Sequence, residues 1–171
     1  SDLRRQRQMC IRDSDKTMSS ITRKYSITRK GEPLDVGLYR WDEETKTLIT
    51  EESDLVLDFS NYDGVTFKTG SYCTFKTGKY CTFKTDEYCT FNTSHDCTFK
   101  TWNNCTFDTG IGCTFKTLWD CTFNTGSNCN FNTSSDCTFR AGCDCNFKTG
   151  RGCIFKTGSY CTFKTGKYCT F

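Results

Sequence analysis

Cysteine is the residue of this sequence with the clearest chemical potential, because it recurs at every eighth position from Cys73 to Cys169. Regularly spaced thiols could bind a metal, form disulfide bonds or fill a packed core. Structural zinc sites usually take their cysteines in short, paired spacings. Only Cys143 and Cys145 approach such a spacing, and neither a second pair nor a histidine lies near them. We therefore expect no metal and no other cofactor.

The two other uses of the cysteines remain open. A thiol is a small, apolar side chain that can fill a tight corner of a core, and Val65 stands at a cysteine position of the repeat. Alternatively, cysteines two repeats apart could be stacked neighbours, within the Cα separation of roughly 4.4–6.8 Å that a disulfide needs. A ladder of such bonds would suit an extracellular particle or fibre. Packing is our first expectation, and a disulfide ladder is the alternative.

Catalytic groups are sparse in this sequence. His95 is the only histidine, and it stands in a turn-like run shortly before Cys97. A Cys–His nucleophile would need that thiol to face the imidazole ring, whereas the strand pattern directs Cys97 inward. The repeats hold no Gly-rich phosphate loop and no carboxylate pair suited to general acid–base catalysis. We do not expect an enzyme.

An eight-residue repeat from Leu57 to Phe171 must position these residues. Its unit reads Cys-Thr-Phe-Lys-Thr-Gly-x-Tyr, and all 15 phenylalanines occupy its third position. A β-prone run followed by turn formers predicts a short strand and a turn. Because side chains alternate along a strand, Cys and Phe share the inner face, while the first Thr and Lys share the outer face. Leu57 and Val65 are expected at the cysteine position of the first two units.

Stacked copies of such a strand can bury one continuous apolar face. The repeat therefore predicts an all-β fold, a parallel and in-register β-solenoid. The expected core ladder comprises Phe75, Phe83, Phe91, Phe99, Cys73, Cys81, Cys89 and Cys97.

Position four of the repeat indicates how many repeats make one coil. Alternate repeats carry an almost uniform lysine there, while the others vary. This alternation favours two repeats per coil and about seven coils, with Phe opposite Phe across the core. A triangular coil of three repeats, or three chains wound together, is the alternative.

The N-terminal run from Arg4 to Ser14 matches the translation of an adaptor used in transposase-based sequencing. We interpret residues 1–14 as a sequencing artefact. The alternative is a basic arm that binds nucleic acid. Without this segment the formal net charge of +3 falls to near zero, so the charge balance implies nothing about partners.

Residues 15–54 are expected to form a small N-terminal cap on the first coil. They lack the octad and hold the only proline, Pro33. The segments 36–41 and 45–50 flank an acidic turn and predict a β-hairpin. Such a cap would cover the open strand edge of the solenoid, which occupies residues 55–171.

The outer face of the predicted solenoid presents ranks of threonine and lysine. Flat threonine arrays are typical of ice-binding β-solenoids, which usually show Thr-x-Thr, whereas this repeat shows Thr-x-Lys. The lysine rank could contact an anionic surface, but acidic residues are expected to interrupt it, so we expect no nucleic-acid partner. The interrupting residues are Asp86, Glu87, Asp96, Asp108 and Asp120.

Large apolar residues at turn positions predict a lateral contact with another solenoid. They are Trp102, Ile111, Leu118 and Trp119. Local shielding of the core is the alternative role for these side chains.

The Cys-Thr-Phe-Lys-Thr-Gly octad resembles that of octapeptide-repeat proteins of phages, giant viruses and marine metagenomes. The likeness spans residues 57–171 and is specific in its motif. It carries no established activity that could be transferred. Pentapeptide-repeat solenoids are a looser likeness, and their different period means that their function does not carry over.

We expect a structural protein, a self-assembling fibre or spike segment on an extracellular or virion surface. The expected partner is a second copy, joined head to tail at an assembly edge of Cys169, Thr170 and Phe171, because an unpaired in-register strand can template another. No stretch reaches the roughly 20 apolar residues of a membrane helix, so no membrane span is expected. The alternative function is a surface-binding module, adhesin-like or ice-binding, that uses the outward Thr and Lys ranks.

Overall fold

The repeats form short parallel strands, which the computed structural model describes within residues 25–171. Each strand lies on the Thr-Phe-Lys-Thr segment, as in β7 (Thr74–Thr77), whose residues alternate between exposed and buried. Thr and Phe favour an extended backbone, and their alternation gives the strand one buried face. Residues 1–14 lie outside the described part of the chain, so their interpretation stays a prediction.

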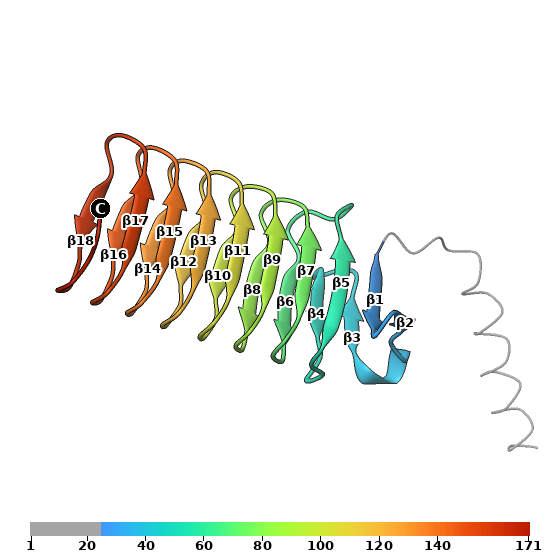
Figure 1. The fold of residues 1–171 in the computed structure, drawn as a ribbon. Coiled ribbons are helices and arrows are strands. Elements are labelled where there is room, and N and C mark those ends of the chain that lie inside the picture. Colours follow the sequence, from blue (N-terminus) through green and yellow to red (C-terminus); the bar gives the residue numbers. More distant parts are fainter. Residues whose placement is uncertain (1–24) are drawn as a thin grey trace, which may run out of the picture.

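Two sheets run side by side along the molecule, and the chain crosses from one to the other at each turn (Figure 1). In spatial order, sheet A contains β17 (Ile154–Thr157), β15 (Thr138–Ala141), β13 (Thr122–Thr125), β11 (Thr106–Thr109), β9 (Thr90–Thr93), β7, β5 (Leu55–Phe59), β1 (Ser26–Arg29) and β2 (Glu32–Pro33). Sheet B contains β18 (Thr162–Lys164), β16 (Asn146–Lys148), β14 (Asn130–Asn132), β12 (Thr114–Lys116), β10 (Thr98–Lys100), β8 (Thr82–Thr85), β6 (Thr66–Thr69), β4 (Thr47–Ile49) and β3 (Arg40–Asp42).

Strands of the solenoid pair in parallel with the strand two repeats away. Phe75 lies opposite Phe91 in sheet A, and Phe83 lies opposite Phe99 in sheet B. The predicted β-solenoid with two repeats per coil is therefore confirmed, and the triangular alternative is wrong. In-register stacking keeps every Phe on the inner face, since a slip by one residue would expose it to water.

The turns close on a residue in the left-handed backbone region at position eight of the repeat. Its φ is 59° at Tyr80, 57° at Asp96 and 72° at Gly112. Gly, Asn and Asp adopt this conformation readily, whereas tyrosine does so at some energetic cost. This requirement accounts for the Asn, Asp and Gly residues that replace Tyr at this position.

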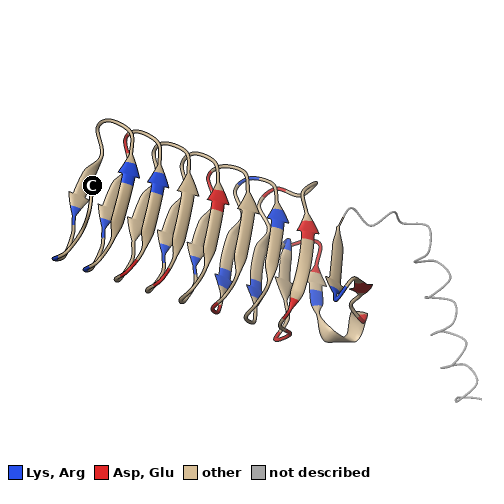
Figure 2. Ribbon diagram, in the orientation of Figure 1, with Lys and Arg blue, Asp and Glu red and all other residues tan. Residues whose placement is uncertain are grey.

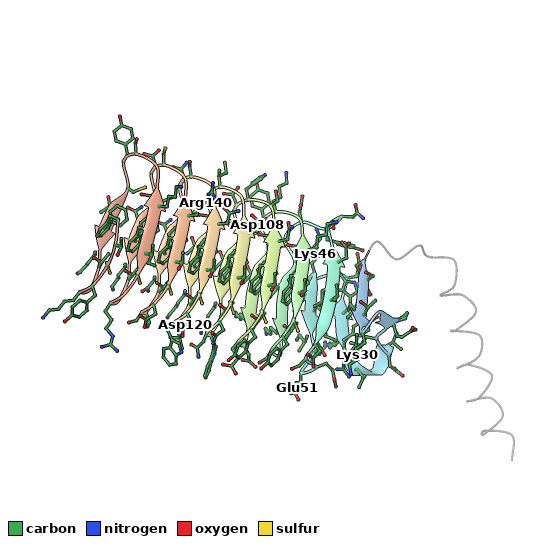
Figure 3. The ribbon with its side chains drawn as sticks, in the orientation of Figure 1. Lys30, Lys46, Glu51, Asp108, Asp120 and Arg140 are labelled. Carbon is green, nitrogen blue, oxygen red and sulfur yellow. The ribbon has the colours of Figure 1, made fainter. Side chains whose placement is uncertain are left out.

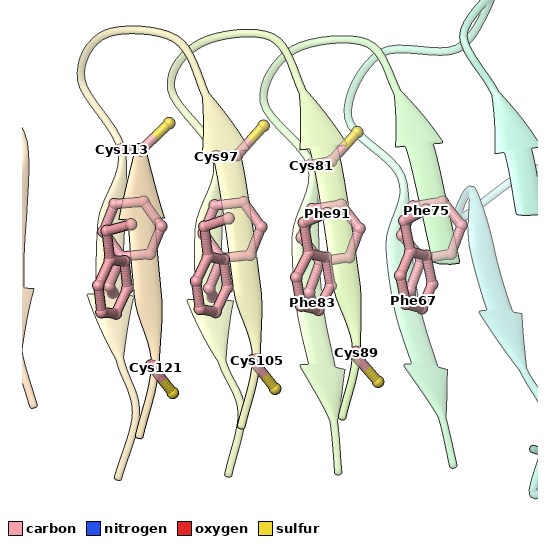
Figure 4. Packing of buried hydrophobic residues seen from close by; sticks show 14 of the residues in the cluster. Phe67, Phe75, Cys81, Phe83, Cys89, Phe91, Cys97, Cys105, Cys113 and Cys121 are labelled. Carbon is pink, nitrogen blue, oxygen red and sulfur yellow. The ribbon is translucent and has the colours of Figure 1, made fainter. Parts of the chain in front are cut away.

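The core consists of a phenylalanine zipper flanked by two columns of cysteine (Figure 4). Phe75 stacks on Phe91 of the next coil at 5.0 Å between ring centroids, and it meets Phe83 of the facing sheet edge-on at 5.3 Å. Both arrangements are favourable geometries for aromatic pairs. The four phenylalanines and four cysteines of the expected core ladder are each at most 1% exposed.

The described part of the N-terminal segment forms a small β-cap against the first coil. The β3–β4 hairpin is antiparallel, and β1 pairs antiparallel with β5 of the first coil. The first hairpin strand begins only at Arg40, because Val36–Leu38 forms a 3-10 turn after Asp35, whose side chain accepts a hydrogen bond from the Gly37 amide. Among residues 25–171, no helix has the length and apolar character required to cross a membrane.

The solenoid register begins before the octad does. Strand β4 pairs in parallel with β6 and places Leu48 opposite Phe67, so the cap already supplies one rung of sheet B. In sheet A, Leu57 lies opposite Phe75 and therefore occupies the phenylalanine position. The expectation that Leu57 fills the cysteine position was wrong by two residues. A two-residue shift preserves the inner face, which is why the sequence pattern does not reveal it.

Phe59 is displaced by the same shift. It lies opposite Thr77, at the corner position of the repeat. There its ring stacks on Tyr25 at 4.6 Å and meets Phe67 edge-on at 5.1 Å. Phe59 thus joins the cap to the phenylalanine zipper.

Candidate functional site

The cysteine columns lie along the two rows of turns, one at each edge of the core (Figure 4). The Cys105 thiol donates to the carbonyl oxygens of Asn103 at 3.3 Å and Asp86 at 3.6 Å, and other column cysteines repeat this pattern. Each cysteine of the described chain is a free thiol. The packing role is therefore what the structure shows, and none of the disulfides of the alternative is present among these residues.

The protein environment suppresses ionisation of several of these thiols. Burial raises the pKa of Cys153 above its ordinary value, and the nearby Cys169 and Asp136 raise it further by their charge. At Cys89, hydrogen bonding to the Cys105 thiol and burial together raise the pKa to about 11. Because the thiolate is the reactive form, such cysteines are weak nucleophiles near neutral pH.

His95 lies in a turn, and its side chain is 38% exposed. Its Nδ1 lies 2.7 Å from Oδ2 of Asp96, and its ring meets that of Tyr80 edge-on. The buried Cys97 thiol donates to the His95 backbone carbonyl and not to the ring. The geometry thus separates the two groups of the Cys–His pair considered from sequence. No group of three or more potential metal ligands occurs within residues 25–171.

The outer face of sheet A carries both signs of charge (Figures 2 and 3). Asp58 lies opposite Lys76. A hydrogen bond from Ser60 lowers the pKa of Asp58, and the charge of Lys76 lowers it further. Asp108 accepts a hydrogen bond of 3.0 Å from the Asn124 side chain. Opposite charges and amide partners therefore balance the stacked column at position four of this sheet.

The outer face of sheet B carries a column of cations that contains no acidic residue. We call the stacked residues at position four of this sheet the lysine column: Lys68, Lys84, Lys100, Lys116, Lys148 and Lys164, with Asn132 between the fourth and fifth lysines. All of them are exposed. Within the described chain, no carboxylate lies within ion-pair distance of these lysines.

The acidic residues expected to interrupt this rank lie elsewhere. Asp108 belongs to sheet A, while Asp86, Glu87, Asp96 and Asp120 lie in turns. The expectation of an interrupted basic surface was therefore wrong for sheet B. The uniform lysine at position four of alternate repeats indicated that these lysines share one face of the solenoid. The sequence alone did not show on which face each acidic residue lies.

The predicted lateral contact is divided between two rows of turns. Trp102, Leu118 and Trp119 follow strands of sheet B, whereas Ile111 follows β11 of sheet A and lies in the opposite row. Trp102 and Leu118 line a groove of ≈ 260 Å³ together with Lys100, Lys116 and Asn132 of the lysine column. The sequence-predicted cluster therefore reduces to three residues in one row of turns, of which Trp102 and Leu118 line the groove beside the lysine column.

The predicted assembly edge lies on the last coil. Thr170 bridges in parallel to Ile154, and the Phe171 ring stacks on Phe155 at 5.1 Å. The other side of Phe171 is uncovered, so 70% of the residue is exposed. Cys169 is half-buried.

Comparisons of the chain with protein-family models, with curated proteins and with solved structures find no match. The resemblance to octapeptide-repeat proteins therefore remains an expectation. The argument for function rests on the surfaces and edges described above.

Proposed function

We propose that this chain is a structural protein, a stiff β-solenoid segment of a fibre. The observation that supports this function is the unbroken stacking of the core along the molecule. Stacked rings lie 4.6 Å apart at Phe131 and Phe147 and 5.1 Å apart at Phe67 and Phe83. Each coil thus buries its apolar face against its neighbours, which is how solenoid repeats produce an extended, rigid body.

We further propose that copies join head to tail through the edges of their sheets. The Thr149 amide donates to the Lys164 carbonyl of the following coil. The Thr165 amide occupies the equivalent position one coil later, directly after β18, and therefore faces outward. At the cap, Pro33 blunts the edge of sheet A because proline has no amide hydrogen. The short strand β3 leaves an edge on sheet B, and this edge is the proposed acceptor for β18 of another copy.

Negative-stain electron microscopy of the purified chain, with and without reductant, tests this proposal. We expect unbranched filaments in both conditions, because the described thiols are free. Filaments that disappear on reduction would overturn assembly by strand stacking in favour of disulfide bonding. Monodisperse short rods would overturn self-assembly.

A matched pair of variants locates the assembly edge. Thr165→Pro removes an outward amide without breaking a hydrogen bond within the chain, whereas Thr165→Val keeps this amide. We expect filaments to shorten or vanish only in the proline variant. Equal filament lengths in both variants would show that copies do not join through β18.

A further inference from the structure

The lysine column holds six lysines and no acidic residue. Lys84 lies between Lys68 and Lys100 in register, and Lys100 lies between Lys84 and Lys116. Parallel strands place such neighbours about 4.8 Å apart along the sheet. Asp58 and Asp108 break the equivalent column of sheet A, and Figure 2 shows both colours on the odd-numbered solenoid strands but no acidic segment on the even-numbered ones.

Hydroxyl and amide groups accompany this column on the same face. Position two of the sheet B strands presents an exposed or half-exposed column of Thr66, Thr82, Thr98, Thr114, Asn130, Asn146 and Thr162. A second groove, of ≈ 190 Å³, continues over this face and is lined by Asn130, Asn146 and Lys148 among others. A ligand along the solenoid would thus meet cations in one column and neutral hydrogen-bonding groups in the next.

An aromatic ring forms part of one wall of the larger groove. Trp102 is 56% exposed and lies beside Lys100, while Leu118 continues this wall on the next coil. Exposed tryptophan offers an apolar face with a polar edge, and such rings are enriched where proteins bind partners. The groove therefore combines an apolar wall with lysines and an amide.

We infer that this face of sheet B binds a linear anionic polysaccharide along the solenoid axis. The lysines would pair with its carboxylate or sulfate groups, the Thr and Asn column with its hydroxyl groups, and Trp102 with the apolar face of a sugar ring. Single-stranded nucleic acid fits less well, because its bases would need a succession of stacking platforms. Duplex DNA fits less well too, because its phosphates wind around an axis while the lysine column stays on one sheet along the molecule (Figure 1).

The test is a binding titration of the full chain with three probes: polygalacturonate oligomers, neutral dextran and an oligothymidylate of matched charge number. We expect polygalacturonate to bind at low salt and to weaken steeply as salt is added, because the contacts are largely ionic. Dextran should not bind. Tighter binding of oligothymidylate would overturn the polysaccharide in favour of nucleic acid, and no binding of polygalacturonate at low salt would overturn the inference altogether.

Two double variants with the same change in net charge assign the binding face. Lys100→Glu with Lys116→Glu removes cations of sheet B, and we expect the affinity to fall by about tenfold or more. Lys76→Glu with Lys156→Glu changes sheet A instead, and the affinity should fall by less than about threefold. Equal losses would show a diffuse attraction to net charge. Circular dichroism of all variants checks that the solenoid is intact.

A third variant separates sugar recognition from simple ion pairing. Trp102→Ala leaves every lysine in place, and we expect it to weaken polygalacturonate by about fivefold without changing the salt dependence. Unchanged affinity would remove Trp102 from the site and leave an unselective polyanion surface.

Discussion

The corner threonine at position five shows how much the environment of a single residue matters in this repeat. The Thr69 hydroxyl donates to the Gly70 carbonyl at 3.4 Å. Its neighbour in the next coil, Thr85, is also buried, but its hydroxyl oxygen has no hydrogen-bond partner. A buried polar group without a partner loses its hydration and gains nothing in return. The two positions therefore differ in energy, and their sequences differ in the next residue, which is Gly70 in one repeat and Asp86 in the other.

Replacing Thr85 by valine should stabilise the protein. The methyl group fills the space of the unpaired hydroxyl, so we expect the free energy of unfolding to rise by about 1 kcal/mol. Thermal or urea denaturation measures this change. Thr69→Val is the matched control in the same sheet and should bring no gain, because it removes a hydrogen bond. A loss of stability at Thr85 would mean that its hydroxyl is satisfied in solution, for example by a cysteine sulfur.

At the scale of the strand, the lysine column destabilises sheet B through repulsion between like charges on neighbouring strands. Like charges directly opposite each other on neighbouring strands are destabilising. Two unit charges about 4.8 Å apart repel by about 0.9 kcal/mol in water before salt screening. Long lysine side chains reduce this cost by spreading apart. The remaining repulsion between the lysines would be relieved by an anionic partner bound to this face.

Replacing one central lysine should therefore stabilise the free protein. Lys100→Gln removes two repulsive neighbours, Lys84 and Lys116. We expect a gain of about 0.5 kcal/mol at low ionic strength, which should vanish near 1 M salt because the Debye length is then about 3 Å. Lys76→Gln, beside Asp58 in sheet A, should lose stability under the same conditions. A gain that persists at high salt would have to come from strand propensity instead of charge.

Strand-scale features were largely predictable from sequence. The alternation of Cys and Phe with Thr and Lys determines which side chains lie inside, and the uniform lysines of alternate repeats indicate the two-repeat coil. The displacement of Leu57 was not predictable, because a two-residue shift leaves the inner face unchanged. The sequence alone did not show that Ile111 and Trp102 lie in opposite rows of turns, because that depends on which strand each residue follows. The net charge of each sheet face was unpredictable for the same reason, since it depends on where each acidic residue lies in the fold.

At the scale of the whole molecule, the cysteine columns place a titratable thiol in the core at every repeat. Each coil adds one cysteine to each column, as Cys105 and Cys113 show, and both are buried. An unfolded thiol ionises near pH 8.5. A buried thiol whose pKa is raised stays protonated at higher pH, so the folded state then binds more protons than the unfolded state. Stability must fall as the pH rises above the unfolded value.

Cys153 provides a direct test of such a loss of stability at alkaline pH. Burial raises the pKa of its thiol, so its stabilising contribution is complete below about pH 8 and declines as the pH approaches 10. Each such thiol lowers the free energy of unfolding by at most about 1.4 kcal/mol per pH unit in this window. Urea denaturation at pH 7.5, 9 and 10 measures the decline. Cys153→Val places in this position the residue type found at buried Val65, and its decline should be shallower. Parallel declines in the two proteins would show that Cys153 does not contribute, and would direct attention to other groups that titrate in this range.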